Sequence, residues 1–360
     1  MNFPVLKIGN LVSTIPIIQG GMGVGISLAG LASAVANEGG IGVIAAAMIG
    51  INEPDVSVNP AEANIRALKR EIRKARELTG GIIGVNIMVA MTHYADLVRA
   101  SVEEGVDIII SGAGLPMDLP GYLVNGAKTK LVPIVSSARA AKLISQKWLT
   151  KYNYLPDAYV LEGPKAGGHL GFKQEQIGDP DYALDKLVKE VIETLKPFAA
   201  ERNTTIPVIA AGGIFTGGDI REMLNLGAAG VQMGTRFVGT YECDANPGFK
   251  ETYLNAEKED MVIIKSPVGL PGRAIKNQFL DEVKNGNRKP FKCPYQCIKT
   301  CDTDKSPYCI ALALSAAKKG KFKNGFAFAG ANAYRVNEIV SVKDLIRSLQ
   351  QEYDQAFLSH

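Results

Sequence analysis

The stretch AYVLEGPKAGGHLG (158–171) places a histidine between glycines, directly after a strand-like run. Ala158 to Leu161 is apolar and ends at Glu162, as a buried strand that runs into a loop does. Glycine lets a backbone approach a flat ligand closely. His169 can therefore face a ligand from this loop. The same sequence is also consistent with a loop histidine that binds no ligand.

Three more apolar runs end in glycines. Gly20-Gly21-Met22-Gly23 follows Ile15–Ile18, Gly212-Gly213 follows Pro207–Ala211, and Gly234-Thr235 follows Gly230–Met233. Loops of this kind present backbone N–H groups with little side-chain obstruction, which suits an anion such as phosphate. The alternative is that the glycines serve only to make tight turns.

Two polar residues stand at the ends of other runs. Asn86 lies just inside the end of Ile82–Met88 and could bond a ring or ribitol oxygen, or simply be a polar residue beside a turn. Glu162 needs a partner or water at such a position. A ribitol hydroxyl and a nearby lysine are the two candidate partners of the Glu162 carboxylate.

Four of the five cysteines crowd into one segment, Cys293, Cys297, Cys301 and Cys309, with the spacing C-x3-C-x3-C-x7-C. Zinc sites more often contain C-x2-C pairs, and cysteine-only ligation beside a proline also suits an iron–sulfur cluster. A cluster, a structural zinc ion and unliganded thiols all remain open. Cys243 stands alone and is expected to be inert.

Eight apolar runs alternate with helical stretches, which predicts a parallel sheet covered by helices. Eight units in about 240 residues fit a closed (β/α)8 TIM barrel. An open doubly wound sheet is the alternative, but no acidic residue ends its second strand, where a dinucleotide ribose would bind. In the barrel, the loops after the seventh and eighth strands commonly bind phosphate. The glycine loops after the first and sixth strands leave room for a flavin, so the pattern indicates flavin mononucleotide, FMN.

The remaining features define the domains and exclude several classes of protein. We expect residues 1–245 to form the barrel and residues 246–360 to form a mainly helical C-terminal subdomain or lid, with one helix over Gly272–Lys284. A net charge of +4 with scattered basic residues argues against nucleic acid. No signal peptide or membrane-spanning run is evident. We therefore expect a cytoplasmic enzyme with a small-molecule substrate, and a homodimer is compatible with the sequence.

The chain resembles the nitronate monooxygenase (2-nitropropane dioxygenase) superfamily, which includes the FMN-dependent enoyl-acyl-carrier-protein reductases. The matching motifs, in family order, are PIIQGGMG, GVNIMV, EGPKAGGHLG, PVIAAGGI and GVQMGTRF. The resemblance implies FMN as cofactor and His169 as the active-site histidine. The cofactor-binding residues expected from the loops and the resemblance together are Gly21, Met22, Gly23, Asn86, Glu162, Gly167, Gly168, Gly212, Gly213, Gln232, Met233, Gly234 and Thr235.

Two departures bear on the substrate. Many nitronate monooxygenases have glutamine at the position of Glu162 and an acidic residue at that of Lys165, and the cysteine segment belongs to neither branch of the superfamily. The expected activity is oxidation of alkyl nitronates with O2. The alternatives are reduction of an enoyl thioester with NAD(P)H, favoured by the segment SPVGLPGRAIKNQFL, and a flavin and metal redox sensor or electron relay.

Overall fold

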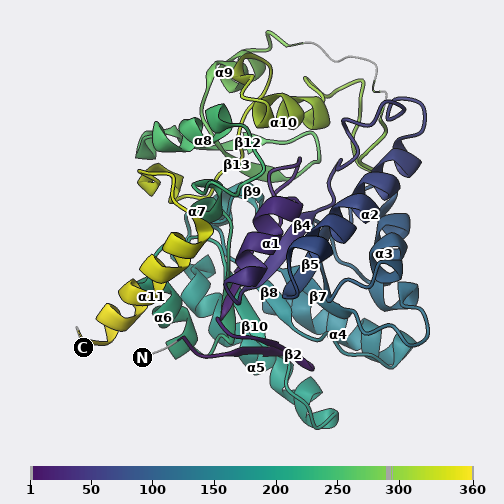
Figure 1. The fold of residues 1–360 in the computed structure, drawn as a ribbon, viewed down its shortest axis with the longest axis vertical. Coiled ribbons are helices and arrows are strands. Elements are labelled where there is room, and N and C mark those ends of the chain that lie inside the picture. Colours follow the sequence, from purple (N-terminus) through teal and green to yellow (C-terminus); the bar gives the residue numbers. More distant parts are fainter. Residues whose placement is uncertain (1–2, 289–292, 294, 359–360) are drawn as a thin grey trace.

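Eight parallel strands close into a barrel in the computed structural model, which describes residues 3–288, 293 and 295–358 (Figure 1). Around the barrel the order is β10-β11-β3-β4-β5-β6-β7-β8. The strands are β3 (Ile17–Gln19), β4 (Ile41–Ala45), β5 (Ile82–Met88), β6 (Ile108–Gly112), β7 (Lys130–Val135), β8 (Tyr159–Glu162), β10 (Val208–Ala211) and β11 (Gly230–Met233). Closure confirms the (β/α)8 prediction and rules out the open sheet, because β10 pairs with both β8 and β11.

Helices follow the strands and cover the outside of the barrel. They are α1 (Ala29–Asn37), α2 (Pro60–Leu78), α3 (Tyr94–Glu103), α4 (Ala138–Tyr152), α5 (Leu184–Glu201), α6 (Gly217–Asn225) and α7 (Thr235–Val238), with only a short 3-10 helix, Leu119–Tyr122, after β6. Helix α6 begins with a capping box, in which the Thr216 side chain accepts from Asp219 N while the Asp219 carboxylate accepts from the N–H groups of Thr216 and Phe215.

The N-terminal residues form an antiparallel hairpin that the sequence analysis did not predict, β1 (Leu6–Ile8) and β2 (Leu11–Ser13). Leu6 and Ile8 are 1% exposed and pack with Ile18, Ile41 and Ile108 inside the barrel. Ile41 and Ile108 begin their strands, so the hairpin closes the end of the barrel at which strands start. The opposite rim is left for loops.

The C-terminal region gathers at the other end of the molecule (Figure 1). It contains α8 (Pro247–Leu254), β12 (Met261–Lys265), β13 (Pro271–Ile275), α9 (Gln278–Lys284) and α10 (Ile310–Lys318). The single helix expected over Gly272–Lys284 is wrong. Its first residues form β13, which pairs with β12 and with β9 (Gly168–His169), and the helix begins only after Asn277, whose side chain caps it at Leu280 N.

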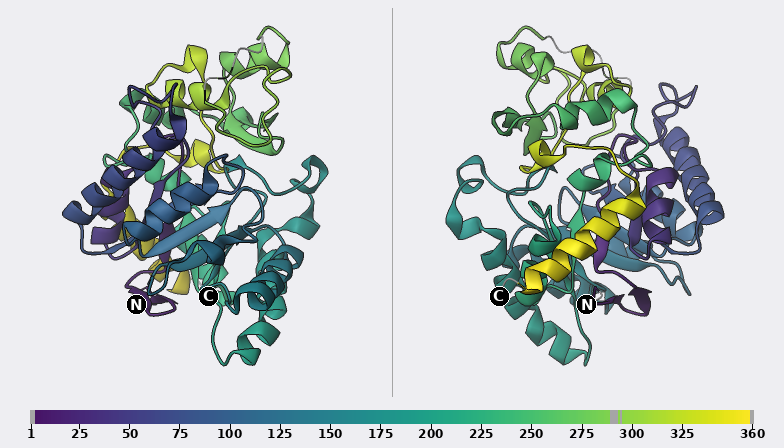
Figure 2. Two further views of the ribbon diagram at one scale, coloured as in Figure 1. Left: turned by 90° about the vertical axis from the view of Figure 1, so that its right-hand side faces the viewer. Right: turned by 60° about the vertical axis from the view of Figure 1, so that its left-hand side comes forward.

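The last helix, α11 (Val342–Leu358), returns along the side of the barrel, as the right-hand view of Figure 2 shows. It packs against α6, where Glu352 accepts from Gly217 N at 2.7 Å. Across the described residues, no helix combines the length and the apolar character that crossing a bilayer requires.

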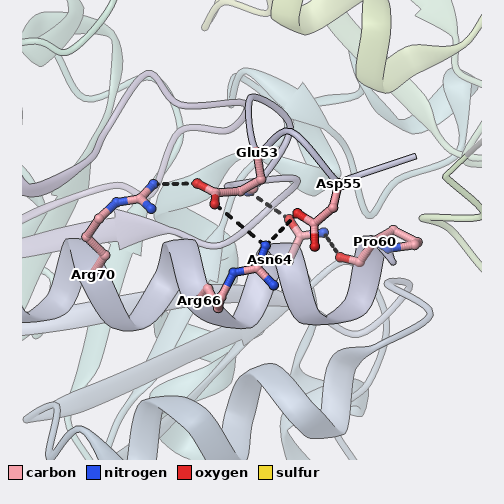
Figure 3. A network of polar contacts seen from close by, with 7 residues as sticks. Glu53, Asp55, Pro60, Asn64, Arg66 and Arg70 are labelled. Atoms are coloured by element: carbon pink, nitrogen blue, oxygen red, sulfur yellow. Dashed lines mark hydrogen bonds and ion pairs between the residues drawn. The ribbon is translucent and has the colours of Figure 1, made fainter. Parts of the chain in front are cut away.

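The loop between β4 and α2 is fixed to α2 by a polar network (Figure 3). Arg66 pairs with Asp55 at 2.5 Å and Arg70 with Glu53 at 2.8 Å. Asn64 donates to Pro60 O at 2.6 Å and accepts from Gly50 N at 2.9 Å. The network holds in place a loop that packs against the cysteine segment.

Candidate active site

A cavity of about 280 Å³ opens at the rim where the barrel strands end. His169 and all thirteen residues predicted to bind the cofactor line it. Loops that follow β3, β5, β8, β10 and β11 therefore meet at one place, because the carboxyl ends of parallel strands share one rim. The role of each residue stays a prediction.

The loop after β3 approaches β5 so closely that a side chain is excluded. A Cβ added at Gly21 would lie 2.3 Å from Asn86 Cβ and 3.3 Å from Val43 Cγ1. The N–H of Met22 is already used, because it donates to Ser27 Oγ at 2.8 Å. Gly21 and Gly23 are thus the residues of this loop whose N–H groups suit a flat ring.

The two loops predicted to bind phosphate lie side by side. Gly212 and Gly213 have φ values of +93° and +95°, a conformation that favours glycine. Helix α7 begins at Thr235 and is only four residues long. Backbone N–H groups, rather than a helix dipole, are therefore what these loops offer an anion.

Two polar side chains in the cavity wall fit the cofactor that the resemblance implies. Gln232 Oε1 is buried without a hydrogen-bond partner among the described atoms. A buried acceptor without a donor is costly, and the hydroxyl and imide donors of FMN would satisfy it. The glycine loops and the unpaired oxygen of Gln232 therefore fit FMN.

Glu162 ends β8 in the same wall, and burial raises the pKa of its carboxyl to about 8. At neutral pH the side chain is therefore a neutral acid, with one O–H donor and one carbonyl acceptor. A neutral acid offers a hydrogen-bonding pattern close to that of glutamine, the residue expected here in many relatives. The departure seen in the sequence is thus small at pH 7.

His169 lies on β9, held by the pairing of that strand with β13. Its Nε2 lies 2.7 Å from Ser266 Oγ. Its ring and that of Phe328 pack edge to face, with their centroids 5.0 Å apart. Burial lowers the pKa of the imidazole to about 4, so the ring is neutral at pH 7. Ser266 Oγ also accepts from Val268 N at 3.2 Å. Among the described atoms Nε2 is the one acceptor in reach of the Ser266 hydroxyl proton, so the tautomer with the ring proton on Nδ1 satisfies both groups.

The sequence analysis missed the residues that the C-terminal region contributes. Asn332 donates to Gly213 O at 2.6 Å, Gly330 N donates to Thr235 Oγ1 at 3.2 Å, and both residues line the cavity. Arg273 on β13 donates through Nη1 to the carbonyls of Pro164 and Ala166 at 2.7 and 2.6 Å. The glycine-rich stretch 325–330 was the one available signal.

The four clustered cysteines lie outside this cavity. They line a second cavity with Thr92 and Tyr308. Burial, together with the neighbouring Cys309, Cys293 and Cys301, raises the pKa of the Cys297 thiol to about 12. Among the described residues, no group of three or more His, Cys, Asp and Glu side chains is arranged to hold a metal ion, so this arrangement shows neither the zinc site nor the iron–sulfur cluster considered from the spacing. Cys243 is buried elsewhere, 3.6 Å from Ile26 O.

The closed barrel, with its glycine rim and the neutral histidine beside the cavity, places the protein in the (β/α)8 class. A model of the nitronate monooxygenase family matches residues 6–352, and the chain belongs to that family.

Two relatives of similar identity to this chain carry the names of different enzymes. A probable nitronate monooxygenase of Bacillus subtilis is 27% identical over 94% of this chain and 96% of its own length. A hydroxy-methyl-oxo-octahydroindene-carboxyl-CoA dehydrogenase of Mycobacterium tuberculosis is 29% identical over 76% of this chain, which spans 66% of that relative.

Solved structures resemble the whole chain. FabK from Thermotoga maritima is 28% identical, with a TM-score of 0.72 over 96% of this chain and 94% of its own. A nitroalkane oxidase from Streptomyces ansochromogenes has a TM-score of 0.73 over 98% of both chains at 23% identity, which supports the fold alone.

Proposed function

We propose that this protein is an FMN-dependent nitronate monooxygenase, which oxidises alkyl nitronates with O2. The observation that carries the proposal is the neutral, buried imidazole of His169, held by Ser266 beside a glycine-lined cavity. Family membership and the Bacillus relative favour this activity.

The residues of the cavity would divide the work between binding and proton placement. The loops with Gly213 and Thr235 would hold the phosphate of FMN, while Asn86, Glu162 and Gln232 would bond its ring and ribitol. When bound, FMN supplies the electron chemistry of the reaction. The Nδ1 proton of His169 suits donation to an anionic oxygen better than abstraction of a proton from carbon. The nitronate anion is therefore a better substrate than the neutral nitroalkane.

The test is a substrate comparison on the purified protein with its bound flavin. Oxygen uptake and nitrite release are followed with an alkyl nitronate and with the corresponding neutral nitroalkane. We expect both signals with the nitronate and much slower turnover with the nitroalkane. Absence of oxygen uptake with nitronates, in protein that retains flavin, would overturn the proposal.

A second candidate function is reduction of an enoyl thioester with NAD(P)H. The specific observation in its favour is that the segment SPVGLPGRAIKN forms β13 and its connection from β12, and supplies Ser266 to His169. The same Nδ1 proton would then stabilise an enolate oxygen. FabK and the CoA dehydrogenase are the relatives that favour it. NADH and NADPH oxidation with a crotonyl thioester, in the same protein batch, distinguishes the two functions.

A further inference from the structure

The four clustered cysteines share one cavity outside the candidate active site. Cys293, Cys297, Cys301 and Cys309 line a space of about 410 Å³ between the C-terminal region and the loop after β5. Cys297 interacts electrostatically with each of the other three, and Cys309 with Cys293 and Cys301. All four thiols are free. The spacing noted in the sequence therefore produces a gathering of thiols around one space.

Hydrogen-bond donors surround the same cavity. Tyr308 is 6% exposed, lines the cavity, and its hydroxyl has no partner among the described atoms. Gln296 N already donates to Cys293 Sγ at 3.3 Å, and Ser306 Oγ lies 3.7 Å from Cys301 Sγ. A buried hydroxyl without an acceptor is costly. Sulfide or thiolate sulfur in the cavity would accept a hydrogen bond from it.

The walls are fixed to the barrel. Thr92 N donates to Cys297 O at 3.1 Å, and Lys299 N donates to Ala90 O at 2.9 Å, so the segment pairs with the loop after β5. The loop after β4, held by the network of Figure 3, contributes Met48 and Val56 to an apolar cluster against which Cys293, Cys297 and Cys309 pack. Backbone hydrogen bonds and apolar packing thus tie the cysteine segment to two loops of the barrel.

Two kinds of metal site differ in how far apart their four sulfurs stand. Four sulfurs around one zinc ion lie about 2.3 Å from the metal and so about 3.8 Å from one another. Among the described residues, no group of three or more His, Cys, Asp and Glu side chains is arranged to hold a metal ion, which argues against so compact a site. A polynuclear core places its own iron and sulfide atoms between the cysteines, which then stand farther apart around a larger space.

We propose that Cys293, Cys297, Cys301 and Cys309 bind an iron–sulfur cluster in this cavity, with the Tyr308 hydroxyl as a hydrogen-bond donor to it. Leu314 of α10 packs against the same apolar cluster as Cys293, Cys297 and Cys309 and also lines the candidate active site. Cluster binding itself does not depend on the function proposed above.

The experiment measures the cluster directly in the full chain, purified without oxygen and, where iron is below saturation, reconstituted with ferrous iron and sulfide. We expect about four iron and four sulfide per chain for a four-iron cluster, or about two of each for a two-iron cluster. Broad absorbance near 400 nm and an electron paramagnetic resonance signal after dithionite reduction should accompany them. Flavin content is measured on the same samples.

Matched serine variants test the ligands. Cys297→Ser should lose most of the iron and sulfide but keep its flavin, which shows that the chain is folded. Cys243→Ser removes the one cysteine outside the cavity and should keep the iron, the sulfide and the spectrum of the unmodified protein. Stoichiometric zinc without iron, a disulfide within the segment, or no uptake of iron and sulfide by flavin-loaded protein would each overturn the proposal.

Discussion

His169 shows how a single side chain acquires its chemistry from its surroundings. Burial keeps the ring neutral, and Ser266, 2.7 Å away, selects which nitrogen carries the proton. Glu162 is the complementary case, since burial keeps its carboxyl protonated up to about pH 8. Two titratable residues thus face the cavity without charge at neutral pH. An anionic substrate meets hydrogen-bond donors there and no fixed carboxylate.

His169→Ala should lower kcat on the true substrate by about two to four orders of magnitude, because a positioned proton donor is removed. Flavin content should not change. Ser266→Ala keeps the ring but frees its tautomer, and a loss of about tenfold is expected. Steady-state kinetics on nitronate and enoyl thioester measure both variants. A kcat for His169→Ala within a few-fold of the unmodified protein would show that the imidazole does not act on the substrate.

At the scale of elements, the rim is built by close contact between loops. The loop after β3 lies against β5, and the loop after β8 is tied from outside by β13. In both places backbone geometry, rather than a side chain that binds ligand, sets the shape of the cavity. Changes at these contacts should therefore affect cofactor binding before chemistry.

Gly21→Ala should weaken flavin binding by tenfold or more and destabilise the fold by roughly 1–3 kcal/mol, because the new methyl overlaps Asn86. Flavin titration of the flavin-free protein and thermal denaturation measure the two effects. The control is Gly80→Ala, at an exposed site where an added Cβ meets nothing within 4 Å. Equal behaviour of the two variants would contradict the role given to the β3 loop.

Arg273→Lys should loosen the loop after β8, because lysine cannot reproduce the two contacts that one guanidinium nitrogen makes with Pro164 and Ala166. We expect a loss of about 2–3 kcal/mol in unfolding free energy and weaker flavin binding. The exposed Arg99→Lys, whose partner is Asp96, serves as the control. If Arg273→Lys binds flavin as tightly as the unmodified protein does, the Arg273 guanidinium is not needed to position the loop after β8.

Strand runs and glycine turns could be predicted from the sequence because both are local patterns. Ile82–Met88 and Gly230–Met233 were located to the residue, and the glycine loops converge as parallel strands require. Contacts between distant segments could not be predicted. The pairing of β9 with β13 joins residues about a hundred positions apart, and it converted the start of an expected helix into a strand. Ser266 and Asn332 reach the site through such contacts.

The whole molecule is a barrel closed at one end by the N-terminal hairpin and covered at the other by the C-terminal region. That covering contributes Phe328, Gly330 and Asn332 to the cavity wall. It also carries the cysteine cavity, and three of those cysteines pack against the same apolar cluster as Leu314 of the pocket wall. The C-terminal region is therefore part of the site and not an addition beside it.

Burying ionisable groups in the cavity should leave a signature in the stability of the flavin-free protein. The pKa of Glu162 is about 8 in the fold, against 4.5 as its ordinary value. As pH rises from about 4.5 to 8, the unfolded chain loses this proton while the folded chain keeps it, so stability falls over that interval. Glu162→Gln removes the titration. The free energy of unfolding of the variant, relative to that of the unmodified protein, should therefore increase as pH rises, by roughly 2–4 kcal/mol at pH 8.

Chemical denaturation at pH 5, 7 and 8.5 measures this difference. Asp118→Asn provides a comparison of opposite sign, because Lys151 and Tyr152 lower the pKa of the Asp118 carboxyl. Its stabilising effect is present above about pH 4 and is lost in acid, so that variant should be slightly less stable at every pH used. A pH-independent difference for Glu162→Gln would mean that Glu162 is ionised in the fold. The neutral hydrogen-bonding wall proposed for the flavin would then be wrong.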